Sequence, residues 1–203
     1  ETASNAHWAQ NTLDEIWRFA KTVQEETLPE DEASSRHLKE KLSHLSLKAP
    51  HRQCSRNRKK ETEIGGKCYL VTEGRMGFET EIKHSNAGLK PLEGITEFTM
   101  RFVPGTCEMK FCQQGKEHEV LIATDGSWRW NRLKLDGRVN SELCLSGYWE
   151  DKNCFVVHAR WVETCYENEL KFCFEKDQVH MSRMNKVGRY MTLQQLTATA
   201  QKA

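Results

Sequence analysis

The stretch from Asn153 to Lys176 constrains the fold of this chain more than any other part of the sequence. Apolar residues recur at every second position from Phe155 to Trp161, and again from Leu170 to Phe174, with a short polar turn between the two runs. Side chains of an extended strand alternate between its two faces, so each run predicts a strand with one apolar face. The pair predicts an antiparallel hairpin. Because an isolated hairpin is not stable in water, other elements must cover it.

The same two-residue period begins at Ile64 and predicts a series of short strands. Turn signals such as Pro104-Gly105 separate them. Closely spaced strands favour an antiparallel meander, because parallel strands need long helical crossovers. A meander of about eight to ten strands often closes into a barrel, which removes unpaired edges. The predicted strands are Gly66–Thr72, Phe78–Lys83, Ile95–Val103, Thr106–Cys112, His118–Thr124, Trp128–Lys134, Glu142–Trp149, Cys154–Glu163, Tyr166–Glu175 and Gln178–Met184.

The N-terminal part of the chain has a helical period instead. Thr12 and Glu15 have the spacing of a capping box, and the apolar residues around them predict an amphipathic helix over 12–25. Pro29 is followed by acidic residues and favours the first turn of a second helix, because proline tolerates that position and acids stabilise the positive helix end. Leucines at helical spacing follow. We therefore predict a helical hairpin over about 12–47.

The predicted fold is mainly β, an antiparallel up-and-down lipocalin-like β-barrel preceded by an N-terminal helical hairpin. A chain of 203 residues is long enough for one sizeable core and an appendage, but not for two large domains. The predicted segments are a helical hairpin over 1–47, a basic linker over 48–63, a barrel over 64–193 and a C-terminal tail over 194–203. Such a barrel either holds one small ligand or is filled by its own side chains.

The run from Lys48 to Lys60 carries six basic residues and no acid. Such a run could bind an anionic surface through counterion release at phosphates. No aromatic residue is interleaved to stack on a base, and runs of like charge tend to be solvated, so we favour a linker. The whole chain has a net charge of +1, which argues against a dedicated nucleic-acid binder.

Eight cysteines raise the question of disulfides. An even count permits them, but most lie in predicted strands, where a free cysteine packs as a small apolar residue, so free thiols are favoured. No C-x-x-C pair occurs, which argues against a zinc site, and the sequence predicts no metal and no cofactor. The cysteines are Cys54, Cys68, Cys107, Cys112, Cys144, Cys154, Cys165 and Cys173.

The cysteines bear on the cellular compartment only indirectly. Free thiols favour the cytoplasm, whereas a targeting signal lost upstream would allow an extracytoplasmic location. The chain does not begin with Met, so we expect an excised domain or a processed product. No apolar run reaches the roughly 20 residues that a transmembrane helix needs.

Three segments carry a resemblance to a known family: Ile16–Leu47, Ile64–Val71 and Ser146–Met181, within which Trp161-Val162-Glu163-Thr164 is the most specific. Together they resemble the C-terminal region of bacterial serine hydrolases of the β-lactamase and penicillin-binding family. In that family a catalytic domain is followed by a helix pair, a variable linker and a lipocalin-like barrel, and this succession is similar here over about 11–193. The resemblance implies a non-catalytic accessory domain whose partner is the catalytic domain of the same parent chain.

The chemistry of that family depends on a Ser-x-x-Lys nucleophile and a Lys-Thr-Gly strand. Neither motif occurs in this chain, so no catalytic residue is assigned and no enzymatic activity is expected of it. A nucleophilic Cys173 paired with His158 or His180 is conceivable in a hairpin. We do not favour it, because no third residue is evident to orient the histidine.

Two sets of residues are candidates for binding. Trp128, Trp130 and Trp161 could line an aromatic ligand pocket, and Arg160, which shares a strand face with His158, could hold a carboxylate through two hydrogen bonds. Core filling by the tryptophans and a solvated strand face are the simpler interpretations. The residues of this chain that are expected to dock on the catalytic domain are Leu13, Ile16, Trp17 and Ala20.

Two functions follow from these patterns. The main hypothesis is an accessory domain that docks on a catalytic domain and modulates access to its active site. The alternative is a free-standing lipocalin-like carrier of a small apolar ligand, held inside the barrel.

Overall fold

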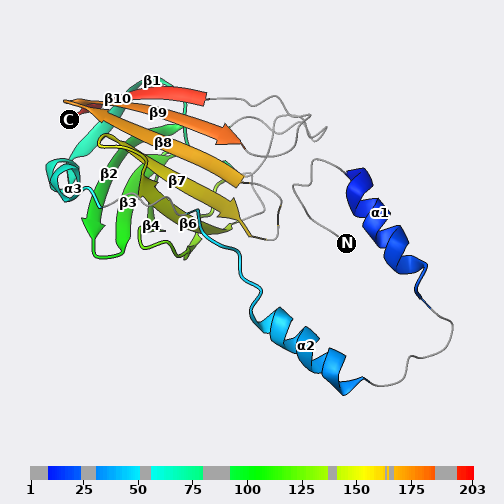
Figure 1. Cartoon of the computed structure of the whole chain (residues 1–203). Coiled ribbons are helices and arrows are strands. Elements are labelled where there is room, and N and C mark those ends of the chain that lie inside the picture. The colour runs from blue at the N-terminus through cyan, green and yellow to red at the C-terminus, as the bar shows by residue number, and fades with distance from the viewer. Residues whose placement is uncertain are drawn as a thin grey trace. The chain divides into compact units, whose positions relative to one another are not determined.

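The computed structural model describes residues 9–23, 31–50, 56–79, 92–136, 141–162, 164, 167–185 and 196–203. The chain divides into two compact units, which Figure 1 shows. One unit, Asn5–Lys48, contains the first two helices. The other includes Ala49–Ala203 and contains a third helix and every described strand.

The structure has helices α1 (Ala9–Ala20) and α2 (Glu32–Ser43) where the helical hairpin was predicted. The predicted capping box is wrong, because α1 begins three residues before Thr12 and Thr12 therefore lies inside the helix. The chain enters α2 at Asp31, whose carboxylate accepts hydrogen bonds from the backbone N–H groups of Ala33 and Ser34. Such a cap satisfies donors that the first turn leaves without a helical partner. Two predicted ends are corrected: α1 ends at Ala20 and not at residue 25, and α2 begins at Glu32 and not at Pro29, because Asp31 is its N-cap.

The described part of the barrel unit contains ten strands. Their bounds are β1 Cys68–Gly74, β2 Ile95–Val103, β3 Thr106–Gln113, β4 Lys116–Ala123, β5 Arg129–Arg132, β6 Glu142–Trp149, β7 Cys154–Trp161, β8 Glu167–Glu175, β9 Gln178–Asn185 and β10 Leu196–Lys202.

The strands form a mainly antiparallel up-and-down barrel with a lipocalin-like fold. Their order in the sheet is β4-β3-β2-β1-β10-β9-β8-β7-β6-β5, and Figure 1 shows the sheet curving round on itself. β1 pairs with β10, and β4 meets β6 where Ala123 lies opposite Ser146. Closure of this kind pairs edges that would otherwise be exposed, and it confirms the predicted fold class.

The hairpin predicted from the alternating stretch is β7 paired with β8. Phe155 lies opposite Phe172, and Val157 lies opposite Leu170, so the two apolar faces coincide. These side chains are fully buried, which accounts for the strength of the alternation in the sequence.

Between β4 and β5 one side chain takes the place of a regular ladder. The Asn131 side-chain oxygen accepts a hydrogen bond from the Leu121 N–H at 2.7 Å, and its amide nitrogen donates to the Leu121 carbonyl at 2.9 Å. An amide side chain can copy both backbone bonds because it carries a donor and an acceptor. Asn131 therefore joins the wall where the chain turns from β4 into the short β5.

Two predicted boundaries need correction. The segment predicted as a C-terminal tail contains β10, which pairs with β1 on one side and β9 on the other. The predicted basic linker, 48–63, contains all but the last residue of helix α3, Arg58–Ile64, and the side chain of that last residue is buried in the core. Asn57 caps α3 by accepting from the Lys60 N–H, and the helix thereby covers one end of the barrel.

The predicted strand Phe78–Lys83 also needs correction within its described part. After β1 the chain leaves the sheet, and residues 75–79, together with residues 92–94, lie across the opposite end of the barrel from α3. Met76 and Phe78 point into the core from this segment, which we call the plug. Residues 80–83 lie outside the described residues.

Aromatic side chains fill the space between the two ends of the barrel. Tyr69 stacks on Phe98 with ring centroids 5.3 Å apart, and Phe78 from the plug lies 5.1 Å from Phe111. Such contacts add directional attraction to the burial of apolar surface. The barrel interior in this structure is a packed core.

Candidate functional site

Gln113, at the end of β3, holds the plug in place. Its amide nitrogen donates to the carbonyls of Phe78 and Glu93, each at 3.0 Å, and its side-chain oxygen accepts from the Phe78 N–H. Gly77 is needed beside it, because a Cβ at that position would lie only 2.9 Å from the Gln113 oxygen. The plug therefore depends on one buried amide and one glycine.

Arg183, on the inner face of β9, is the buried cation of this site, with only 3% of its surface exposed. Its guanidinium donates to the Gly77 carbonyl at 2.8 Å and to the Glu79 carboxylate at 2.9 Å. Burial lowers the pKa of Arg183, and the Glu79 charge acts in the opposite direction. Arginine stays charged at neutral pH even so. A positive charge therefore lies inside the barrel, and the Glu79 carboxylate of the plug is its counter-ion.

The Nε of Arg183 is buried and has no hydrogen-bond partner among the residues that the structure describes. An unpaired buried donor is costly, and exceptions in folded proteins need a reason. The crevice that Arg183 shares with Phe78, Glu79 and Leu92 is too narrow for a water molecule. The guanidinium can bind a carboxylate through two hydrogen bonds once the plug makes room.

Sequence reasoning missed Arg183, Glu79 and Gln113. A signal for Arg183 was present, because it follows Val179 and Met181 at the two-residue spacing of the buried face. A charged residue at a position of the buried strand face needs either an oppositely charged partner inside the protein or a ligand. Glu79 and Gln113 carried no comparable signal, since their roles depend on how the plug crosses the barrel.

The structure separates the predicted ligand residues. Trp161 faces the core, where its indole N–H donates to Asn168, whereas Trp130 is 61% exposed on the outer wall and donates to Glu142. Trp128 is partly buried just before β5. No single pocket brings all of these tryptophans together.

Arg160 and His158 share the outer face of β7, as the spacing predicts. Arg160 donates to Glu167, and the His158 ring lies within 3.3 Å of Glu167 and 3.6 Å of Glu169. This face was expected to be solvated, but His158 is buried and stacks beside Tyr148. The polar groups of β7 therefore belong to a packed network on the outside of the wall.

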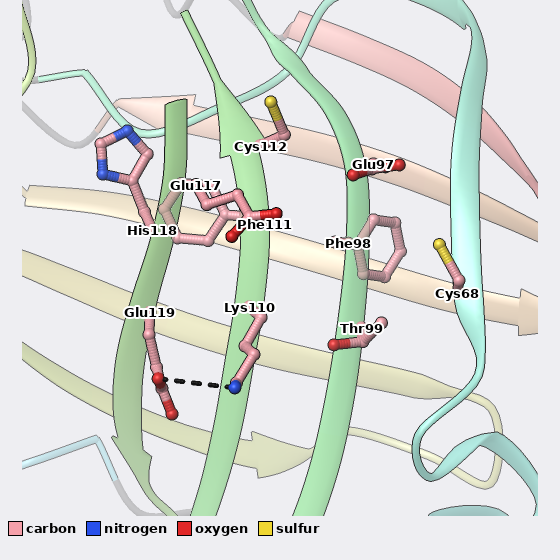
Figure 2. A pocket seen from close by; sticks show the side chains of 10 residues that line it. All are labelled: Cys68, Glu97, Phe98, Thr99, Lys110, Phe111, Cys112, Glu117, His118 and Glu119. Atoms are coloured by element: carbon pink, nitrogen blue, oxygen red, sulfur yellow. Dashed lines mark ion pairs between the residues drawn. The ribbon is translucent and has the colours of Figure 1, made fainter. Parts of the chain in front are cut away.

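A groove of about 400 Å³ lies on β1–β4, and Figure 2 shows the side chains that line it. The thiols of Cys68 and Cys112 are free, and Lys110 forms an ion pair with Glu119 at 3.7 Å. The lining mixes charges and thiols, unlike the apolar lining that most small-ligand pockets share. Among the described residues, no group of three or more metal-ligating side chains is suited to hold a metal ion.

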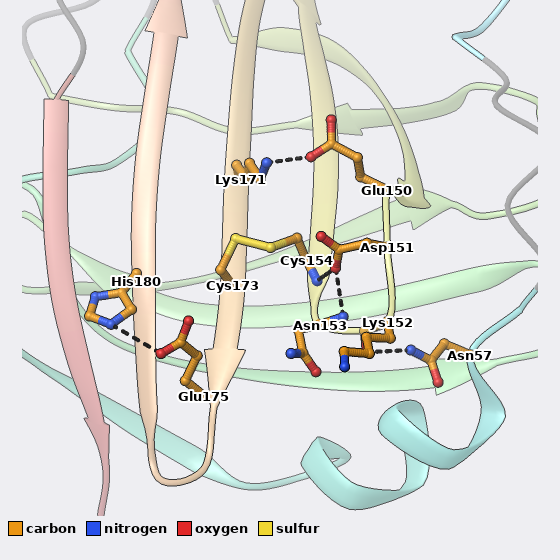
Figure 3. The surroundings of a disulfide bond; sticks show 10 residues. All are labelled: Asn57, Glu150, Asp151, Lys152, Asn153, Cys154, Lys171, Cys173, Glu175 and His180. Atoms are coloured by element: carbon orange, nitrogen blue, oxygen red, sulfur yellow. Dashed lines mark hydrogen bonds and ion pairs between the residues drawn. A yellow bond between two sulfur atoms is a disulfide. The ribbon is translucent and has the colours of Figure 1, made fainter.

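Figure 3 shows a disulfide between Cys154 and Cys173, which lie directly opposite each other on β7 and β8. The expectation of free thiols is wrong for this pair, and a Cys173 nucleophile is excluded while the disulfide is intact. Cys68, Cys107, Cys112 and Cys144 are free. Cys107 is fully buried, and burial raises the pKa of its thiol well above its usual value.

The predicted docking residues of α1 are exposed in the Asn5–Lys48 unit. Trp17 is 64% exposed, and Leu13 and Ile16 are each nearly half exposed. Ala20 is also exposed. Their spacing places them on one side of the helix, so α1 presents an apolar stripe. Among the described residues, no helix is long and apolar enough to cross a membrane.

No family model and no curated protein matches this sequence. Several solved structures have a similar shape. They include the REP1-NXSQ fatty acid transporter, with 12% identity, a TM-score of 0.46, and coverage of 70% of this chain and 97% of that one. As-p18, an extracellular fatty acid binding protein, has 13% identity and a TM-score of 0.47, covering 70% and 96%. Fatty-acid-binding protein 1 of Echinococcus granulosus has 12% identity and a TM-score of 0.47, with coverage of 70% of this chain and 98% of that one.

Sequence identities and TM-scores this low carry no argument about function, and the fold assignment rests on the strand pairing described above. None of these structures is described as a serine hydrolase. The expected parent enzyme of the β-lactamase type therefore has no support beyond the sequence resemblance.

Proposed function

We propose that the barrel binds one small apolar ligand that carries an acidic group, with Arg183 as the anchor of that group. The observation that carries this proposal is a buried guanidinium in a mainly apolar interior, whose Nε has no partner among the described residues. A few placed polar groups in an apolar surrounding are typical of small-ligand sites. The fatty-acid carriers named above are compatible with this function, but the proposal rests on Arg183.

In this proposal the plug occupies the place of the ligand. Glu79 supplies the carboxylate that a ligand would otherwise offer to Arg183, and Phe78 supplies the apolar group beside it. A ligand with both features would displace this pair and keep the charge of Arg183 compensated. An apolar ligand without an acid would leave a buried charge unpaired, which is costly.

The test compares oleate with oleyl alcohol, which has the same chain but no carboxylate. Binding is followed by tryptophan fluorescence, since Trp161 is buried near the plug end of the barrel. We expect saturable binding of oleate, and we expect Arg183→Met to weaken it about tenfold, because a charged hydrogen bond is lost. Binding of oleyl alcohol should be weak and should not decrease in the variant.

Arg132→Met is the matched control. Arg132 is exposed on β5 and pairs with Glu142 on the outside of the wall, so its loss should leave oleate binding unchanged. Absence of saturable oleate binding by the unmodified chain, or equal loss in both variants, would refute the proposal.

A second candidate function is docking on a catalytic domain through α1. The exposed apolar stripe favours it, because a helix with one apolar face buries that face in most folded proteins. In a parent chain with a serine-hydrolase domain, replacing Leu13, Ile16 and Trp17 by Gln should raise the Michaelis constant. Replacing Glu15 and Arg18, which pair with each other at 2.9 Å, by Gln is the control. Unchanged kinetics in the stripe variant would dismiss this function.

A further inference from the structure

Three arginines line a groove of about 560 Å³ beside α3. Arg56 and Arg58 come from the start of the helix, and Arg101 comes from β2, so residues far apart in the sequence meet there. Phe102 and Pro104 complete the side formed by β2 and the turn after it. The basic run seen in the sequence therefore contributes to a defined cavity of the folded chain.

The guanidinium groups in this groove keep free hydrogen-bonding capacity. Arg56 lies 3.7 Å from Glu61, which is beyond hydrogen-bond distance, and Arg58 forms no ion pair with any described residue. Arg101 uses Nε and one terminal nitrogen on Glu108 and keeps the other terminal nitrogen. Guanidinium groups are planar donors that match the oxygens of phosphate and carboxylate.

Glu61 forms the inner boundary of the groove. Its side chain is buried, and one carboxylate oxygen accepts a hydrogen bond from the indole N–H of Trp149 at 3.2 Å. The other oxygen faces Arg56. A buried carboxylate here partly compensates the arginines and sets a limit to how much negative charge the groove accepts.

We infer that this groove binds a compact anion with two or more negative charges, a diphosphate group being the chemistry that fits. Planar guanidinium groups from three lining residues match several phosphate oxygens. The acidic side chains of Glu61 and Glu63 on α3, and of Glu108 on β3, interrupt the positive surface. A long anionic polymer needs a continuous basic track, so the charge pattern favours a compact ligand.

The test is calorimetric titration of the full chain with inorganic pyrophosphate at low ionic strength. We expect one saturable site, and we expect Arg58→Gln to weaken it about tenfold, because an exposed guanidinium loses its hydrogen bonds to the anion. Glu61→Gln should have the opposite effect and tighten binding by about threefold, since it removes a repelling charge and keeps an acceptor for Trp149.

Two controls assign the binding to this groove. Arg36→Gln makes the same change of charge on exposed α2 and should leave the affinity for pyrophosphate unchanged. We also expect pyrophosphate to change the tryptophan fluorescence, because the Trp149 indole N–H donates to Glu61 at the inner boundary of the groove. Trp149→Phe should remove this change. Equal weakening by Arg36→Gln and Arg58→Gln, no effect of Glu61→Gln, or absence of saturable binding would overturn the inference. Heparin binding that exceeds pyrophosphate binding would overturn it too, in favour of a polymer.

Discussion

At the scale of single residues, the plug end of the barrel depends on polar side chains placed among apolar ones. Gln113 is buried, and its side-chain amide forms hydrogen bonds with both the N–H group and the carbonyl of Phe78. Backbone groups that cross a barrel end have no ladder to join, and a buried group without a partner costs free energy. One amide therefore makes an irregular segment compatible with a packed core.

Replacement of Gln113 by Leu tests this role. The substitution keeps the size of the side chain but leaves the Phe78 N–H and two carbonyls without their partner. We expect the free energy of unfolding to fall by about 2–4 kcal/mol, the cost of stranding buried polar groups. Urea denaturation measures it, with Gln201→Leu on the exposed side of β10 as the control. A loss below that of the control would show that the plug is held by its apolar contacts alone.

At the scale of elements, the disulfide fastens the hairpin that organises the fold. Cys154 and Cys173 are 19 residues apart and join β7 to β8 beside the loop before β7. In that loop Asp151 accepts hydrogen bonds from the N–H groups of Asn153 and Cys154, which lower the pKa of its carboxyl group. Figure 3 shows how Lys152 then links the loop to Asn57 at the start of α3.

Removal of the disulfide should lower stability without changing the fold. Closing a loop of this length restricts the unfolded chain, and we expect Cys154→Ser with Cys173→Ser to cost about 3 kcal/mol in the free energy of unfolding. Urea denaturation of the oxidised chain gives the value. Cys144→Ser is the control, because Cys144 is a free thiol on the neighbouring strand. If reduction with dithiothreitol leaves the midpoint of the unmodified chain unchanged, the bond contributes nothing.

The elements also show what the sequence can predict. β2 and β6 have the predicted bounds at both ends, because large apolar residues mark their inner faces. β10 was missed because its inward residues are Ala198 and Ala200, whose small size gives no clear alternation. Phe78 and Glu79 of the plug were predicted to begin a strand, Phe78–Lys83, and the path of the chain across the barrel is not visible in the sequence.

At the scale of the whole molecule, a densely packed barrel is joined to helices with exposed apolar side chains. Composition and length predicted one core with an appendage. They could not predict which cysteines pair, since Cys154 and Cys173 meet only through the register of two strands. The arginine groove was equally hidden, because Arg101 of β2 lines the same groove as Arg56 and Arg58 only in the folded chain.

The pairing of β1 with β10 has a consequence for biosynthesis. Tyr69 is opposite Lys202, so β1 finds one of its two neighbours only after the other described strands have all been translated. Until then the nascent chain exposes an unsatisfied strand edge to other chains on the ribosome, the kind of surface that chaperones protect. This seam makes closure of the wall a late step in maturation.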